Sequence, residues 1–113
     1  MSPLSFYKCL ADDTRLKILL LLVTHKSLCV CDLIDALSLS QPKISRHLAD
    51  LRKCNVVEAQ RQGKWMYYQL HTGLPEWAQQ VLKTTEQANQ GYMEEAYKRL
   101  EHAMSNNCQE TPS

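Results

Sequence analysis

The chain has 113 residues, which is enough for one small domain but leaves little room for a separate catalytic domain. Hydrophobic residues make up 44% and charged residues 22%, an ordinary globular composition that excludes a largely disordered chain or a membrane protein. The formal net charge is only +1, but residues 41–64 hold six basic and two acidic side chains, and such a segment is typical of a phosphate-binding surface.

The location of the protein is predicted from its apolar stretches. The longest runs from Ile18 to Val23, far short of the roughly 20 residues that cross a bilayer. The first residues lack the basic start and apolar run of a secretory signal, so we expect a cytoplasmic protein with no membrane partner. Five unevenly spaced cysteines then fit thiols better than a disulfide framework.

Three helices are predicted in the first third of the chain. Residues 4–11 have helical character, and Asp12 is a suitable N-cap for a second helix. In that helix a buried stripe with helical spacing is expected from Leu16, Leu19, Leu20 and Val23. After a polar break at residues 24–27, residues 28–37 are expected to form a short third helix.

The next two elements predict a winged helix-turn-helix, a mainly α fold with a small β-hairpin. Ser40 can cap a helix whose first turn tolerates Pro42, and whose apolar face is Ile44, Leu48 and Leu51. The opposite face is basic, as in a helix that reads DNA. Residues 56–60 and 65–70 alternate like strands around the turn at residues 61–64, and a hairpin in this place is a wing.

A helical pattern with an apolar stripe runs from Pro75 to about Ser105. A single helix of some 30 residues would extend roughly 45 Å, so we expect its stripe to pack on a second copy of the chain. The alternative is two shorter helices divided near Gly91, packed on their own domain. The domain is predicted at residues 1–105 and a disordered polar tail at residues 106–113.

Cys29 and Cys31 are the candidate sensing residues. In a regular α-helix their side chains would point about 200° apart, so the sulfurs converge only where the backbone around Val30 is extended, as at a helix end. Soft thiolates without a nearby His or Asp select arsenic, antimony, cadmium or lead over hard ions. The alternatives are two small buried side chains or a redox pair. For Cys9 and Cys54 we expect packing roles.

Four segments resemble the ArsR/SmtB family of bacterial metal-responsive repressors, most closely its arsenic-sensing branch. They are residues 10–16 (LADDTRL), 28–33 (LCVCDL), 40–48 (SQPKISRHL) and 62–65 (QGKW), within a resemblance that spans about residues 4–105. The resemblance implies a homodimer built from the first and last helices, which binds operator DNA without metal and releases it on metal binding. It implies As(III) or Sb(III) as inducer, no catalytic cofactor and no enzymatic activity.

In such a protein eight residues are candidates for DNA binding. Arg and Lys can form paired hydrogen bonds with guanine, and Gln with adenine, whereas a basic wing tip grips the backbone or the minor groove. A surface position without DNA contact is an equally good interpretation of His47. The candidates are Gln41, Lys43, Ser45, Arg46 and His47 on the helix, and Arg61, Gln62 and Lys64 on the wing.

The third ligand of the sensing site departs from the arsenic branch, because Ile34 stands where that branch carries a cysteine. Cys54, Cys108 or an external thiol such as glutathione could complete the site. The cadmium- and lead-sensing branch shares Cys-Val-Cys but uses a cysteine in an N-terminal extension that these residues lack. The zinc-sensing branch uses paired Asp and His ligands on the last helix, and this pattern is absent because His102 is the only histidine there. A thiol-redox or cadmium/lead-responsive repressor is the alternative function. A winged helix that binds only protein is disfavoured by the basic helix and wing.

Overall fold

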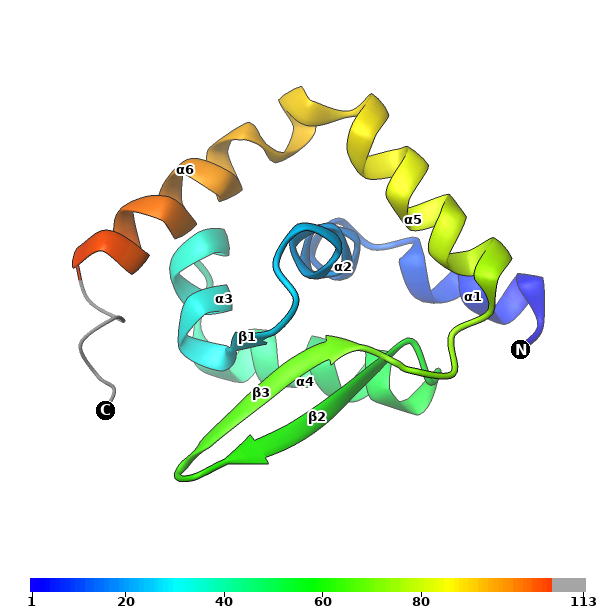
Figure 1. Ribbon diagram of the computed structural model, residues 1–113, viewed down its shortest axis with the longest axis horizontal. Helices are drawn as coiled ribbons and strands as arrows, with labels where there is room; N and C mark the ends of the chain where they lie inside the picture. Colours follow the sequence, from blue (N-terminus) through cyan, green and yellow to red (C-terminus); the bar gives the residue numbers. More distant parts are fainter. Residues whose placement is uncertain (107–113) are drawn as a thin grey trace.

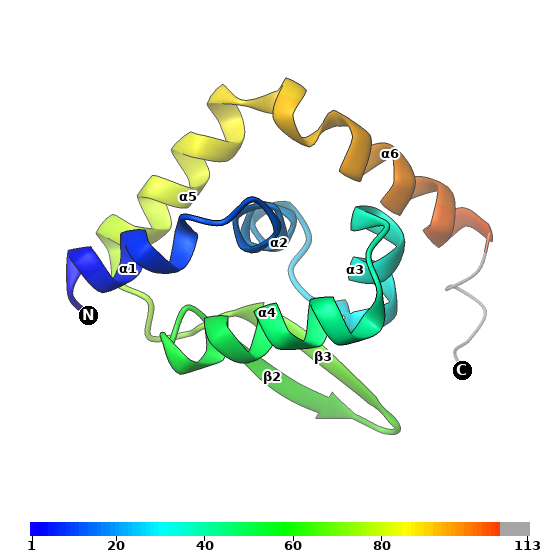
Figure 2. The same cartoon turned by 180° about the vertical axis from the view of Figure 1, so that it is seen from behind.

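The computed structural model describes residues 1–106, and its helices enclose a central helix while a hairpin extends to one side (Figures 1 and 2). Within these residues the prediction of a mainly α winged helix-turn-helix fold with a small hairpin is confirmed. The elements in chain order are α1 (Pro3–Leu10), α2 (Asp13–Thr24), β1 (Leu28–Cys29), α3 (Val30–Leu37), α4 (Gln41–Lys53), β2 (Val57–Gln62), β3 (Trp65–Leu70), α5 (Glu76–Ala88) and α6 (Gln90–Asn106).

Helix α2 is buried around its whole circumference. Its N-cap Asp12 accepts a hydrogen bond from the Arg15 backbone N–H at 3.0 Å, as predicted. All five residues from Ile18 to Leu22 are at most 3% exposed, whereas Leu16 and Val23 are half-buried. The predicted single stripe was therefore too narrow, because α1, α3, α4, α5, α6 and β3 all pack around this helix.

The third helix begins later than predicted. Leu28 and Cys29 form strand β1, which pairs antiparallel with β3, so that the sheet has the order β1-β3-β2. The prediction of a helix from residue 28 was wrong because the partner of Leu28 is Tyr68, far along the chain, and local sequence does not show such pairing. Helix α3 consequently starts at Val30, directly after an extended segment.

The helix-turn-helix consists of α3 and α4, which pack against each other. Helix α3 ends at Ser38 in the left-handed conformation, with φ of 57°. Ser40 caps α4 by accepting a hydrogen bond from the Lys43 backbone N–H at 3.4 Å, and Pro42 lies in the first turn as predicted. The predicted apolar face is buried, since Ile44, Leu48 and Leu51 are at most 1% exposed.

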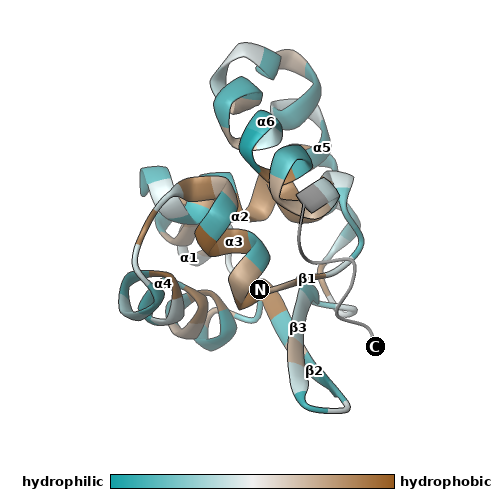
Figure 3. Cartoon of the chain, turned by 90° about the vertical axis from the view of Figure 1, so that its left-hand side faces the viewer, coloured by the Kyte–Doolittle hydropathy of each residue, from teal (hydrophilic) through white to brown (hydrophobic). Residues whose placement is uncertain are grey.

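The wing has a tighter turn than predicted. Strands β2 and β3 pair from Val57 and Leu70 up to Gln62 and Trp65, which leaves Gly63 and Lys64 as the loop. Arg61 and Gln62 therefore belong to β2 and not to the turn. The loop projects away from the helices and is hydrophilic (Figure 3).

Gly63 has a φ of +68°, a conformation that L side chains rarely adopt, although an added Cβ would meet no atom within 4 Å. We therefore expect Gly63→Ala to lower the free energy of unfolding by about 1 kcal/mol through backbone strain alone. Urea denaturation measures this change. Gly91→Ala is the matched control, because Gly91 lies in α6 in equally open space, and alanine there should stabilise the helix. Equal stabilities of Gly63→Ala and wild type would contradict the strain.

The C-terminal helical region consists of two helices, so the alternative of two shorter helices applies. The break falls at Asn89, and Gly91 lies inside α6. Helix α5 packs on α2, whereas α6 packs along α3. The length argument for a second copy of the chain therefore fails. The sequence predicts Trp77 in the apolar stripe, but Trp77 is 39% exposed, and the buried face of α5 lies beside it. The buried residues of α5 are Ala78, Leu82 and Glu86, and those of α6 are Met93, Ala96, Leu100 and Ala103.

The structure describes only the first residue of the predicted C-terminal tail. Helix α6 includes Asn106, which the sequence placed in the tail, while the rest of that tail, residues 107–113, lies outside the described residues. Among residues 1–106, no helix combines the length and the apolar character needed to span a membrane.

Candidate thiol site and DNA-binding surface

The two predicted sensing cysteines meet at the start of α3. Cys29 is the N-cap, with an extended backbone at φ −89° and ψ 169°, and its Sγ lies 2.8 Å from the Sγ of Cys31. This extended backbone is the condition under which the two sulfurs were expected to converge, and the pairing of β1 with β3 produces it. Because metal–sulfur bonds are about 2.3 Å long, sulfurs this close can hold one ion.

Asp32 is a third group at this site, so the premise that no Asp lies near the two cysteines was wrong. Its carboxylate accepts hydrogen bonds from the Cys29 backbone N–H at 3.0 Å and from the Cys29 thiol at 3.3 Å. The Asp32 backbone N–H in turn donates to the sulfur of Cys29, which completes a capping box. An acid three residues after a helix N-cap is the signal that could have revealed it. The candidate ligand atoms of Cys29, Cys31 and Asp32 all lie within 4.8 Å of one another.

The two thiols differ in their surroundings. Cys29 is 8% exposed, whereas Cys31 is exposed and opens the site to solvent. Burial raises the pKa of the Cys29 thiol, and the nearby Asp32 carboxylate raises it further, although the hydrogen bond with Cys31 acts in the opposite direction. A soft ion must therefore displace the proton of Cys29 when it binds.

The candidates for a third ligand are now fewer. Ile34 packs against the core. Cys54 does not belong to the group of ligating side chains that the described residues form around Cys29 and Cys31. Cys108 lies outside the described residues, so Asp32 is the third potential ligand that residues 1–106 bring to the site.

Four of the five DNA-binding candidates on α4 share an exposed face. These four side chains are exposed, whereas Ile44, Leu48 and Leu51 are buried; they are Gln41, Lys43, Ser45 and Arg46.

His47 is placed differently from both interpretations. Its side chain is only 14% exposed and faces Asp12, with 3.8 Å between His47 Nδ1 and Asp12 Oδ2. That distance permits charge attraction but is too long for a hydrogen bond, and Nδ1 is buried without a hydrogen-bond partner. His47 is therefore half-buried, and its side chain packs against the N-cap of α2.

The wing presents the other three DNA-binding candidates. Arg61, Gln62 and Lys64 are exposed at the end of the hairpin, which projects from the helices (Figure 3), and strand β2 packs against α4. Trp65 pairs with Gln62 next to the loop and is 49% exposed. Together α4 and the wing offer the exposed cations that contact with phosphates requires.

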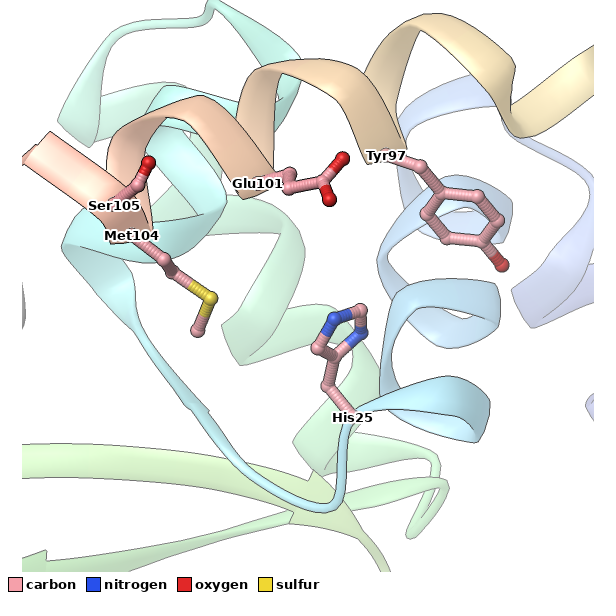
Figure 4. Close-up of a pocket in the computed structure, with 5 residues that line it drawn as sticks. All are labelled: His25, Tyr97, Glu101, Met104 and Ser105. Carbon is pink, nitrogen blue, oxygen red and sulfur yellow. The ribbon is translucent and has the colours of Figure 1, made fainter.

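A separate hollow of about 470 Å³ lies between α6 and the end of α2. His25 and Tyr97 point toward one another across it, beside Glu101, Met104 and Ser105 (Figure 4). The Tyr97 hydroxyl donates to Glu86 at 2.6 Å, and burial together with this bond raises the pKa of Tyr97 to about 12. None of the predicted site residues lines this hollow.

The fold and these surfaces define a winged helix-turn-helix DNA-binding protein with a pair of thiols at the start of the helix that supports the recognition helix. The family model described as bacterial regulatory protein, arsR family, matches residues 12–59. The chain is 48% identical over 93 residues to an arsenic resistance transcriptional regulator of Pseudomonas putida, an alignment that covers 82% of this chain and 73% of the relative.

A second relative and a solved structure agree with this assignment. The chain is 51% identical over 80 residues to the arsenical resistance operon repressor of Escherichia coli K12, which covers 71% of this chain and 68% of that protein. The structure of HlyU from Vibrio cholerae superposes with a TM-score of 0.69 at 27% identity, covering 76% of this chain and 89% of that one. The chain belongs to the arsR family of bacterial regulatory proteins. It is a transcriptional repressor of that family and not an enzyme.

Proposed function

We propose that this repressor binds operator DNA as a homodimer in the cytoplasm and releases it when As(III) or Sb(III) binds Cys29 and Cys31. The observation that carries the proposal is the convergence of these two sulfurs at the N-cap of α3, the helix that packs against α4. Thiolates favour soft ions over hard ones, which fits the arsenic resistance named for two relatives. A third ligand is supplied by Asp32, by Cys108 or by an external thiol such as glutathione.

The capping box supports a mechanism for release. The sulfur of Cys29 accepts the Asp32 backbone N–H, so a bond from the same sulfur to an ion competes with the cap. Loss of a cap destabilises a helix by about 1 kcal/mol. The helix destabilised here is α3, which packs against α4. A coupling of about 1–3 kcal/mol is enough to change DNA affinity roughly 5- to 150-fold.

For DNA recognition we propose that Gln41, Lys43, Ser45 and Arg46 lie at the major groove. The wing residues Arg61, Gln62 and Lys64 contact the backbone or the minor groove. All seven side chains are exposed, which supports these roles. We leave out His47, since its side chain packs against Asp12.

The proposal of a homodimer is supported by an apolar patch on α1 and α5. Leu4 is 64% and Tyr7 49% exposed, and the 39% exposed Trp77 lies next to Tyr7, with 6.4 Å between the ring centroids. Such a patch on a small protein typically marks an interface. Two copies joined here would present two recognition helices, as paired half-sites require.

We expect Leu4→Lys to shift the protein toward monomer at concentrations where wild type is dimeric, because a charge would be buried in the interface. Sedimentation equilibrium measures this shift. Gln87→Lys, an exposed substitution near the far end of α5, is the matched control and should leave the association unchanged. If Leu4→Lys remained as dimeric as wild type, the patch would not be the interface.

The test of the whole proposal is a fluorescence-anisotropy titration of operator DNA with the reduced protein. Arsenite, antimonite, cadmium, zinc and peroxide are added separately. Release by arsenite or antimonite supports the proposal. Release by peroxide alone favours a redox repressor, for which the close approach of the two sulfurs is the supporting observation. Firm binding by protein loaded with As(III) through both sulfurs would refute it.

A further inference from the structure

The wing carries a large exposed aromatic side chain that none of the contacts proposed above uses. Trp65 is the first residue of β3 and is 49% exposed. The other exposed tryptophan, Trp77, packs edge-on against Phe6, with 5.1 Å between the ring centroids. Within residues 1–106 no aromatic ring packs on Trp65 in this way. The ring of Trp65 is therefore accessible to a partner molecule.

The register of the hairpin shows which way Trp65 faces. Side chains alternate between the two faces of a strand, and directly paired residues lie on the same face. Tyr68 and Leu70 pack against the core and lie an odd number of positions from Trp65. Trp65 and its cross-strand partner Gln62 therefore lie on the outer face of the hairpin. The wing loop, which projects away from the helices, directly precedes Trp65 (Figure 3).

The charges around Trp65 suit an anionic partner. Residues 59–66 carry two positive charges, on Arg61 and Lys64, and no acidic side chain. Both cations are exposed. Glu58, the one acid of β2 and β3, lies at the end of the hairpin farthest from the loop. The exposed ring is therefore continuous with the basic surface that we assign to DNA, and its neighbours complement the charge of phosphates.

We propose that Trp65 is a further DNA-contacting residue, whose ring packs on the deoxyribose rings that line the minor groove of the operator. Proteins that bind the minor groove combine basic side chains with apolar ones. This inference rests on the proposed contact of the wing with DNA and adds a contribution of another kind. Arg61 and Lys64 bind by charge and release counterions, so their contribution weakens with salt, whereas an apolar contact releases none.

The exposed area of Trp65 sets the size of the expected effect. A fully covered tryptophan buries about 150–250 Å². About half of the Trp65 surface is still exposed in the free chain. At the usual free energy per unit of buried apolar area, covering that half should raise operator affinity at least about tenfold.

The first experiment is a fluorescence-anisotropy titration of labelled operator DNA over a salt series, with the full chain. Trp65→Ala should lower the affinity at least about tenfold at every salt concentration and leave the salt slope unchanged. Trp65→Phe, which keeps an aromatic ring, should recover part of the loss. Lys64→Ala should instead reduce the slope by about one. A wing that merely unfolded in Trp65→Ala would lose the Lys64 contact too, so an unchanged slope excludes that explanation.

The matched control for this titration is Gln60→Ala. Gln60 is exposed and pairs with Tyr67, so it lies on the same outer face as Trp65 but farther from the loop. Its affinity should stay within about twofold of wild type. A loss as large as that of Trp65→Ala would show that any change in the outer face weakens binding, and would overturn the specific role of Trp65.

The second experiment follows Trp65 itself. The chain has two tryptophans, so the difference in emission between wild type and Trp65→Phe isolates the signal of Trp65. Operator binding should protect this signal from quenching by acrylamide. Hydroxyl-radical footprinting should show deoxyriboses that wild type protects and Trp65→Ala leaves open. Quenching of Trp65 in the complex as strong as in the free protein would overturn the proposal.

The two wing variants separate this inference from the proposed function. Wild-type affinity of Trp65→Ala together with weakened binding by Lys64→Ala would refute the role of Trp65 and leave the wing contact in place. Wild-type affinity of both variants would refute the wing contact as well. A shift of Trp65→Ala toward monomer in sedimentation equilibrium, with unchanged operator affinity, would place Trp65 between two copies of the chain instead of on DNA.

Discussion

Cys29→Ser is expected to abolish operator release by arsenite and to leave operator binding within about twofold of wild type. Serine is a good N-cap, so its hydroxyl can accept the Asp32 backbone N–H in place of the sulfur and preserve the capping box. The substitution therefore removes an ion ligand but keeps the support of α3. In wild type, arsenite should lower operator affinity about 5- to 150-fold, and in the variant this change should vanish.

Two further variants separate the roles of Cys29. Cys29→Ala removes the ligand and the cap together, so it should also lower the free energy of unfolding by about 1 kcal/mol, which urea denaturation measures. Cys54→Ser is the matched thiol control and should respond to arsenite like wild type, because Cys54 lies at the end of α4 and is not among the ligating side chains around Cys29 and Cys31. Release of Cys29→Ser by arsenite at wild-type concentrations would show that Cys29 is not a ligand.

Arg46→Ala is expected to lower operator affinity by about 1–3 kcal/mol and to relax the base preference, because arginine in the major groove can form paired hydrogen bonds with guanine. Lys64→Ala should instead weaken binding to operator and random DNA alike, and reduce the slope of affinity against salt by about one. Both side chains are exposed, so the stability of the fold should hardly change. Titration of both DNAs over a salt series measures all of these effects.

The control for this pair is Lys83→Ala, which removes an exposed lysine from α5, away from α4 and the wing. It should leave the affinity and the salt slope unchanged. Equal losses of affinity for Arg46→Ala and Lys64→Ala on both DNAs would contradict the proposal that Arg46 contacts bases and Lys64 contacts the DNA backbone.

Elements that depend on neighbouring residues were predictable from the sequence. Helix α4 is the best example: the Ser40 cap, the tolerated Pro42 and the buried face of Ile44, Leu48 and Leu51 all arise within one short segment. The hairpin and its exposed tip were predictable for the same reason, since alternation and a glycine turn are local signals. The requirement for an extended backbone between Cys29 and Cys31 also followed from helix geometry alone.

Features that depend on distant parts of the chain were not predictable. Strand β1 exists because Leu28 and Cys29 pair with β3, and this pairing provides the extended backbone that brings the sulfurs of Cys29 and Cys31 together. The inward orientation of His47 likewise arises from packing against another helix.

The sequence by itself determined the recognition helix, the wing and the two candidate sensing thiols, because each rests on spacing within a few residues. The tertiary structure alone decided where α3 begins, that α5 and α6 cover their own domain, and which cysteines meet. The physical reason is that backbone pairing and core packing join residues whose separation along the chain leaves no periodic signal.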